Sequence, residues 1–235
     1  MASLARRARA VQRRLMARYG PAVWRSPLPP LDEVVSTILS QNTNDLNRDR
    51  AFAQLQNRFA TWEEVRDAPL RSVIAAIRSA GLAPQKAPRI QGFLRAVTAE
   101  HGALDLDFLR HRPAEEVRTW LRSFPGVGPK TAAIVMLFSL DMPAFPVDTH
   151  IHRVTRRIGL VPPRVTAEQA HEMLARLFRP EEYKDAHLNL IRLGREICQA
   201  RRPACERCPL TTLCDYYRTV VRPSRSPSRQ KRRPG

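Results

Sequence analysis

The sequence lacks any uninterrupted run of about 18 apolar residues among its 235 residues, so no membrane-spanning helix is expected. Its N-terminal stretch, MASLARRARAVQRRLMARYG, lacks the apolar centre of a secretory signal and predicts a basic amphipathic helix instead. Acidic side chains are scarce, because 22 Asp and Glu stand against 40 Lys and Arg, which leaves a formal net charge of +18. A protein this basic usually binds a polyanion, most often nucleic acid.

Alternation of apolar and polar residues with a period of two is also missing, which argues against β-strands. The apolar share of 43% is nevertheless enough for a folded core. Apolar residues recur at helical spacing in residues 31–40, 50–59, 69–81, 90–102, 114–124, 167–178 and 185–198. The expected fold class is therefore all-α, with about ten short helices joined by Pro- and Gly-containing connections.

Glycine is rare, with nine residues in the chain, yet two of them fall in the stretch FPGVGPKT at residues 124–131. We expect both Gly126 and Gly128 to adopt backbone angles closed to other residues, and Pro129 suits the first position of a following helix. Backbone N–H groups at such a helix start can bind an anion, so Gly126, Val127 and Gly128 are predicted to contact a DNA phosphate. The alternative is a plain turn between two helices.

Cysteine is absent before Cys198, and the four cysteines then follow with the spacing C-x6-C-x2-C-x5-C, at Cys198, Cys205, Cys208 and Cys214. Two disulfides would suit a secreted protein, and a structural zinc ion would more often use two short Cys knuckles than one. Four thiolates so close in sequence favour one [4Fe–4S] cluster. Arg201 and Arg202 lie between the first two cysteines, where they could meet phosphates.

Two segments together carry a resemblance to a known family: LRSFPGVGPKTAAIVM and, after it, FPVDTHIHRVTRRIG. Over roughly residues 30–215 the chain resembles the endonuclease III branch of the helix-hairpin-helix DNA glycosylases, and the spacing of its cysteines matches the cluster motif of that branch. The resemblance implies two helical domains with the active site in the cleft between them. These are a six-helix domain at residues 31–142, which contains the hairpin, and a cluster domain at residues 1–30 and 143–220. Residues 221–235 form a basic tail that is expected to be disordered.

The resemblance also implies a pair of catalytic residues, eighteen positions apart in the sequence: Lys130 and Asp148. Lys130 would attack the sugar C1′, expel the base and form a Schiff base, after which loss of a C2′ proton eliminates the 3′ phosphate. Asp148 would stabilise positive charge at the sugar and assist proton transfer. Taken alone, Lys130 could simply contact phosphate, and Asp148 is a good N-cap for a helix, a role compatible with catalysis. His150 is expected to contact phosphate or to be structural.

A base inside a duplex must be flipped out, and two residues are candidates to fill the space it leaves. Gln41, in the turn SQNTN, could pair with the orphaned base, and Leu82, just after Gly81, could act as a wedge. Alternatively, Gln41 caps a helix and Leu82 belongs to a small core. The chain departs from the family pattern at four nearby positions, which bear on the range of lesions: Asn44, Pro84, Pro88 and Pro129.

The predicted function is that of a bifunctional DNA glycosylase and abasic-site (AP) lyase that excises oxidised pyrimidines from double-stranded DNA. It is expected to act as a monomer without membrane contact, in the bacterial cytoplasm and nucleoid, or in the nucleus or mitochondrion of a eukaryote. One alternative is an enzyme that is mainly an abasic-site lyase. Another is the adenine-glycosylase branch, which needs a glutamate where Ser36 and Thr37 stand, with Glu33 a turn earlier. A third is a non-catalytic DNA-binding module, which would use neither Lys130 nor Asp148.

Overall fold

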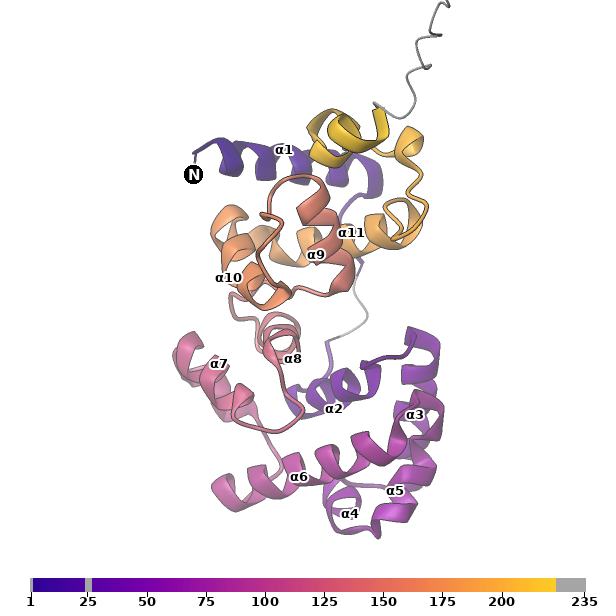
Figure 1. Cartoon of the computed structure of the whole chain (residues 1–235). Coiled ribbons are helices and arrows are strands. Elements are labelled where there is room, and N and C mark those ends of the chain that lie inside the picture. Colours follow the sequence, from indigo (N-terminus) through magenta and orange to yellow (C-terminus); the bar gives the residue numbers. More distant parts are fainter. Residues whose placement is uncertain (1, 24–26, 223–235) are drawn as a thin grey trace, which may run out of the picture. The chain divides into compact units, whose positions relative to one another are not determined.

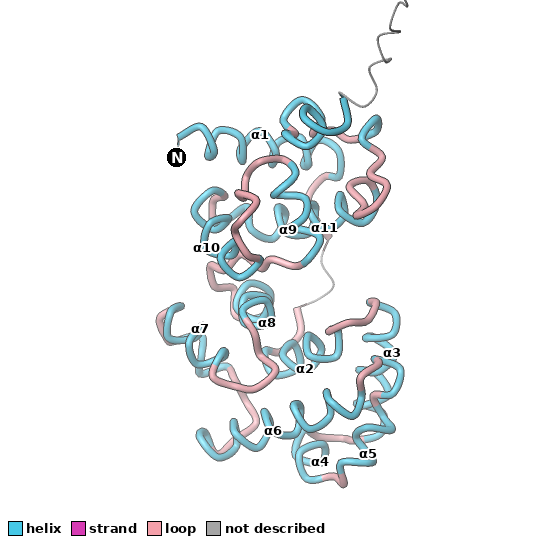
Figure 2. Tube along the Cα trace, viewed as in Figure 1, coloured by secondary structure: helices cyan, strands magenta, loops and turns pink. Residues whose placement is uncertain are grey.

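The computed structural model describes residues 2–23 and 27–222 of the chain, and all regular structure within them is helical, as Figure 2 shows. The all-α prediction is thereby confirmed. None of the helices in the described residues is long and apolar enough to cross a membrane. Contacts divide these residues into two compact units, a central unit at 27–146 and a terminal unit that combines 2–23 with 147–222.

The central unit begins and ends near the predicted domain limits of 31 and 142. Residues 143–146 group with it because Ala144 packs into its apolar core. Its helices are α2 (Pro30–Ser40), α3 (Asp45–Arg58), α4 (Trp62–Asp67), α5 (Leu70–Ala76), η1 (Arg78–Ala80), α6 (Ala83–His101), η2 (Asp107–His111), α7 (Ala114–Arg122), α8 (Pro129–Ile134) and the π-helical turn η3 (Val135–Ser139). Their order along the chain can be followed in Figure 1.

Local sequence chemistry explains where several of these helices start. Asn44 and Thr61 cap α3 and α4, because each side chain accepts a hydrogen bond from the backbone N–H three residues later. Prolines stand in the first turns of α2, α6 and α8, where a missing N–H costs nothing. The helices pack their apolar faces into one continuous core that runs from Leu31 to Ala144.

The terminal unit contains α1 (Ala2–Tyr19), α9 (Thr149–Arg157), α10 (Ala167–Leu177), η4 (Pro180–Glu182), α11 (Tyr183–Glu196), η5 (Cys205–Arg207), η6 (Thr211–Leu213) and η7 (Tyr217–Val221). Helix α11 packs against both α9 and α1 (Figure 1). The predicted apolar face of the first helix is confirmed, since Val11 and Leu15 are fully buried.

The first helix is also tied to the end of the described chain. The Arg7 guanidinium donates to the carbonyl of Ile158 at 3.0 Å and to the carboxylate of Asp215 at 2.9 Å. The predicted start of the disordered tail at residue 221 is corrected, because the η7 turn runs to Val221 and Arg222 is still helical. The rest of the predicted tail, residues 223–235, lies outside the described residues.

Candidate DNA-processing site

The glycine-containing turn of the central unit joins α7 to α8, as expected for a helical hairpin. Phe124, at the start of the turn, fixes it to the core. Its ring meets Phe93 of α6 edge-on at a centroid distance of 5.0 Å and Trp120 of α7 at 4.6 Å. Such edge-to-face pairs add to the stabilisation from burial. Aromatic packing of Phe124 therefore anchors the start of the turn, and the two glycines follow it in the sequence.

The two glycines of the hairpin differ in their backbone conformation. Gly126 has φ +92°, which favours glycine, and a Cβ there would lie 3.0 Å from the Cδ of Arg89, so that side chain would have to shift. Gly128 has φ −85°, which any residue can adopt, and a Cβ there would meet nothing within 4 Å. The expectation that both glycines need special angles is therefore wrong for Gly128. Its open surroundings fit a close approach by another molecule.

Val127, between the glycines, serves the core rather than the surface. Its side chain is buried, and its N–H donates to the carbonyl of Phe124 at 3.1 Å. The contact of Val127 with DNA stays a prediction, and the structure shows its N–H bonded within the turn. The first hydrogen bond of α8 runs from the Ala132 N–H to the Gly128 carbonyl, so the N–H groups of Lys130 and Thr131 take no part in the helix.

Lys130 is half-buried at the second position of α8, directly after Pro129. A cation at the start of a helix is disfavoured by the helix dipole, so this place does not stabilise an ordinary structural lysine. The helix continues into the π-helical turn Val135–Ser139, whose residues are all buried. Lys130 thus stands at the open end of an element whose other end is fixed in the core.

The structure brings Gln41 onto the hairpin. Gln41 follows α2, and its side-chain Nε2 donates to the carbonyl of Gly126 at 3.0 Å, while Arg89 donates to its Oε1 at 3.4 Å. The alternative that Gln41 caps a helix is confirmed as well, because Gln41 is the C-cap of α2 and its backbone N–H donates to the Ile38 carbonyl at 3.3 Å. We call residues 41–44 the Gln41 loop. Asn44 ends it as the N-cap of α3, a role that asparagine fills as well as the aspartate common in the family.

Leu82 precedes α6 and leaves 48% of its surface exposed, so it does not belong to a small core. Its φ of +50° is in the left-handed region, which is uncommon for a branched apolar residue. We call Gly81 and Leu82 the Leu82 turn. Pro84 stands in the first turn of α6, where it is tolerated, whereas Pro88 lies inside the helix and removes one of its hydrogen bonds.

Asp148 belongs to the terminal unit, where it is the N-cap of α9. One of its carboxylate oxygens accepts a hydrogen bond from the Ile151 N–H at 2.7 Å, and the residue is half-buried. His150 lies in the first turn of the same helix. Its Nδ1 is 3.1 Å from the Arg153 guanidinium, and its Cβ faces Gly194 of α11. A cap of this kind fixes the position of the Asp148 carboxylate against the helix.

Arg153 and Arg157, one helical turn apart on α9, connect this helix to the first cysteine. Arg153 donates to the carbonyls of Gly194 at 2.8 Å and Cys198 at 3.0 Å. Arg157 donates to the carbonyls of Gln199 and Ala200 at 2.7 and 2.8 Å, and its guanidinium lies 4.7 Å from the ring centre of Tyr216. Sequence reasoning missed both residues. Their spacing of four in RVTRR was the only available signal.

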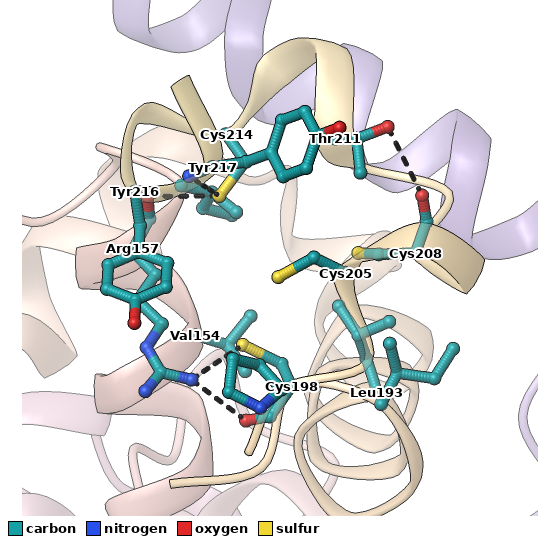
Figure 3. Close-up of a pocket in the computed structure, with 13 residues that line it drawn as sticks. Val154, Arg157, Leu193, Cys198, Cys205, Cys208, Thr211, Cys214, Tyr216 and Tyr217 are labelled. Carbon is teal, nitrogen blue, oxygen red and sulfur yellow. Dashed lines mark hydrogen bonds between the residues drawn. The ribbon is translucent and has the colours of Figure 1, made fainter. Parts of the chain in front are cut away.

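All four cysteines line one pocket in the terminal unit, and Figure 3 shows their sulfur atoms around an open space. About 360 Å³ of space lies between the atoms there, part of it open to solvent. The cysteines form no disulfide. Burial raises the pKa of Cys208 to about 11 and also raises the pKa of Cys214, and the neighbouring thiols add to both shifts. Thiolates in this pocket therefore need a positive partner.

The groups around the pocket bear on what it could hold. Within the described residues, no three His, Cys, Asp or Glu side chains are arranged so that they could hold a single metal ion. Two sulfurs also have N–H donors, since Arg157 lies 3.4 Å from the Cys198 Sγ and the Tyr217 N–H lies 3.4 Å from the Cys214 Sγ (Figure 3). Donors of this kind stabilise thiolates that bind iron. Four cysteines with such donors fit the predicted iron–sulfur cluster. Arg201 and Arg202, in the same segment, are exposed.

The chain is similar to known proteins over most of its length. The family model of the HhH-GPD superfamily of base excision DNA repair proteins matches residues 35–180. Endonuclease III of Thermotoga maritima is 34% identical over 189 residues, which cover 80% of this chain and 84% of that protein. A candidate DNA glycosylase of Arabidopsis thaliana is 42% identical over 154 residues. These cover 66% of this chain but 52% of the plant protein, so the chain spans about half of that relative.

Solved structures agree with the sequence matches. The structure of an endonuclease III trapped as a covalent intermediate with DNA, in a complex with an estranged adenine, has a TM-score of 0.80 to this chain. Its sequence is 27% identical, and the match covers 92% of this chain and 98% of that one.

Proposed function

Since the chain belongs to the HhH-GPD superfamily of base excision DNA repair proteins, and within it to the endonuclease III family, we propose that it excises oxidised pyrimidines from double-stranded DNA as a bifunctional glycosylase and abasic-site lyase. The observation that carries the proposal is the place of Lys130. It is the half-buried lysine in the first turn of α8, immediately after a glycine turn whose Gly128 is open to close approach. A nucleophile at that position lies beside a bound phosphate.

The proposed reaction proceeds in two stages. The neutral amine of Lys130 forms a bond to C1′ as the bond from C1′ to the base breaks, and the base leaves with a proton. The sugar ring then opens to give a Schiff base. Loss of a proton from C2′ breaks the bond from C3′ to the phosphate oxygen, and water finally releases the lysine. Positioning of the amine beside C1′ accounts for a large share of the acceleration.

Asp148 supplies the negative charge that these reaction steps need. Its carboxylate stabilises positive charge at the sugar and at the Schiff base, and it can accept or return a proton. The hydrogen bond from the Ile151 N–H uses one carboxylate oxygen and holds the group still. The proposal requires Lys130 and Asp148 to reach the same sugar.

DNA contacts are proposed for residues in both units. Gln41 would pair with the orphaned base, and Leu82 would fill the gap in the stack. Phosphates would meet Gly126, Gly128, His150, Arg201 and Arg202. A DNA substrate places the enzyme with the chromosome, in the cytoplasm of a bacterium or in a DNA-containing compartment of a eukaryote, and one chain carries all the proposed groups, so we propose a monomer.

Cys198, Cys205, Cys208 and Cys214 would hold a [4Fe–4S] cluster. When bound, the cluster supplies a rigid cross-link through four thiolates, with no open position for chemistry at the sugar. The segment between Cys198 and Cys205, which carries both exposed arginines, would be fixed by it. The raised pKa of Cys208 means that the thiols give up protons as the group binds.

Borohydride trapping tests the proposed nucleophile. Wild-type protein incubated with a duplex that contains an abasic site should form a covalent adduct after reduction, and Lys130→Ala should form none. Lys184→Ala is the matched control, because Lys184 is an exposed lysine in the first turn of another helix, and it should trap like the wild type. Full trapping by Lys130→Ala would show that another amine is the nucleophile.

Release of damaged bases tests the substrate class. Duplexes with thymine glycol or 5-hydroxycytosine should lose the base under single-turnover conditions, whereas an undamaged duplex should not. Strand cleavage at abasic sites without base release would instead identify an enzyme that is mainly a lyase.

A further inference from the structure

Lys86, on α6, is a buried lysine that the proposed reaction does not use. Only 1% of its surface is exposed. Its ammonium donates to the carbonyl of Leu39 at 2.8 Å and to the carbonyl of Ala80, also at 2.8 Å. Leu39 stands two residues before Gln41, and Ala80 stands two residues before Leu82. One ammonium thus joins the backbones that lead into the Gln41 loop and the Leu82 turn.

We infer that Lys86 is a positioning residue, whose ammonium fastens the Gln41 loop to the Leu82 turn so that both side chains reach the DNA in a fixed register. The inference rests on the proposed roles of Gln41 and Leu82. All the residues concerned lie in the central unit, so their mutual arrangement is defined within one compact body.

The electrostatics of the site favour a cation. Leu39 is in the last turn of α2, and Ala80 ends η1, so both carbonyls lie at helix C-termini, where the backbone carries partial negative charge. Lysine has three donors and no acceptor, which suits two convergent carbonyls. Burial lowers the pKa of Lys86, because a charged ammonium there loses solvation. A purely structural contact could be made by an apolar side chain without that cost.

Backbone strain marks the same two segments. Among the described residues, three that are not glycine have positive φ, and two of them are Asn42, at +52°, and Leu82, at +50°. Such conformations are strained, most of all for Leu82, and persist only where the surroundings hold them. Lys86 also donates its own backbone N–H to the Leu82 carbonyl at 3.0 Å. The lysine therefore holds the Leu82 turn from both its ammonium and its main chain.

Helix α6 offers a matched control for this lysine. Gln91 is 2% exposed, and its side-chain amide donates to the carbonyls of Val65 and Ala68 at 2.9 and 2.8 Å. It is similarly buried and makes the same kind of bond to backbone carbonyls, but those carbonyls lie at the end of α4 and lead into neither the Gln41 loop nor the Leu82 turn.

The experiment compares Lys86→Met with Gln91→Leu on two substrates. Methionine keeps the length and burial of the lysine but donates no hydrogen bond. The first substrate is an abasic site in a duplex, where Gln41 and Leu82 must enter the base stack. The second is an abasic site in single-stranded DNA, which has no partner base and no stack to open. The measured quantity is the rate at which each substrate forms the borohydride-trapped adduct.

Lys86→Met should form the trapped adduct with duplex DNA more slowly, on the order of tenfold to a hundredfold, because Gln41 and Leu82 are no longer held in fixed positions relative to each other. Its rate on single-stranded DNA should match the wild type, and Gln91→Leu should match the wild type on both. The fluorescence of 2-aminopurine opposite a tetrahydrofuran abasic analogue should rise less with Lys86→Met, since that base is unstacked less. Thermal melts identify folded variants, and Lys86→Leu, which also donates no hydrogen bond, replaces Lys86→Met if the latter does not fold.

Equal losses on both substrates, or no loss on the duplex, would overturn the positioning role. If Gln91→Leu showed the same losses, the effect would belong to α6 as a whole, and this too would overturn the positioning role. Failure of the proposed function has a separate signature, because wild-type protein would then trap neither substrate.

Discussion

The two units hold their candidate residues in different ways. In the central unit, the hairpin, the Gln41 loop and the Leu82 turn rest on one apolar core that extends through α2 to α8. In the terminal unit, only Cys205 and Leu210 are buried among residues 198–222. That segment is held by polar contacts instead, such as the bonds from Arg157 to the carbonyls of Gln199 and Ala200 and from Arg14 to that of Pro209.

The difference shows that a segment can be ordered without a core of its own. Short segments that bury little apolar surface usually depend on cross-links, because the entropy of ordering exceeds the gain from burial. The cluster proposed for the four cysteines around one pocket would provide such a cross-link. The central unit needs none, and it contains no cysteine within the described residues. Substitutions in one unit should therefore have different effects on structure and activity from substitutions in the other.

The largest effect is expected from loss of the cross-link. Cys198→Ser should abolish the brown colour of the iron–sulfur protein, and residues 198–222 should then exchange amide hydrogens quickly. Helix α6 should remain protected, because its core contains none of the cysteines. Hydrogen exchange followed by mass spectrometry measures the protection of both segments, and iron analysis measures the loss of the cluster. Intact protection of residues 198–222 in a colourless variant would contradict the cross-link.

Asp148 should give the next largest effect, on chemistry rather than on folding. Asparagine caps a helix as well as aspartate, so Asp148→Asn should melt like the wild type while base excision falls by about 10²–10⁴. Asp148→Ala should also lose about 1 kcal/mol of stability, because the bond from the Ile151 N–H is gone. Single-turnover rates and thermal melts distinguish the two roles.

Thr166→Ala is a matched control for the loss of a cap. Thr166 caps α10 in the same unit through a capping box. That variant should lose stability without loss of excision rate. An Asn variant of Asp148 that excises at the wild-type rate would show that the carboxylate is only a cap.

The two hairpin glycines should separate stability from binding in the central unit. Gly126→Ala forces a side chain into positive φ against Arg89, so it should cost about 1–2 kcal/mol and lower the melting temperature. Gly128→Ala adds a methyl group in open space at an ordinary φ, so the melt should not change. Weaker binding of an abasic duplex by Gly128→Ala, seen in a titration, would support a phosphate at that glycine, and unchanged binding would count against it.

The smallest effect is expected at the surface of the cysteine segment. Replacement of Arg201 and Arg202 together by alanine should flatten the slope of log affinity against log salt by about one to two units, without changing the choice of lesion. Binding titrations over a range of salt concentrations measure the slope. A control pair at Arg176 and Arg192, both exposed on other helices and paired with nearby glutamates, should leave it unchanged. An unchanged slope for both pairs would mean that the cysteine segment does not face DNA.

The sequence by itself determined the helical class, the hairpin and the set of four cysteines. Each depends on local patterns, such as period-3.6 spacing, a proline at the start of a helix and short spacings between like residues. It also indicated Asp148 as a cap, because that bond spans three residues of the chain. Its prediction failed for the backbone angles of Gly128, since φ in a turn depends on what packs against it.

Only the tertiary structure decided which distant groups meet. The bonds from Lys86 to Leu39 and Ala80 span 47 and 6 residues, and the bond from Gln41 to Gly126 spans 85. Arg157 reaches Cys198 across 41 residues. No periodicity along the chain records such contacts, because they depend on how helices pack and which backbone carbonyls are left at their ends. The sequence alone therefore does not distinguish a buried lysine such as Lys86 from an exposed one, because its hydrogen-bond acceptors come together only in the fold.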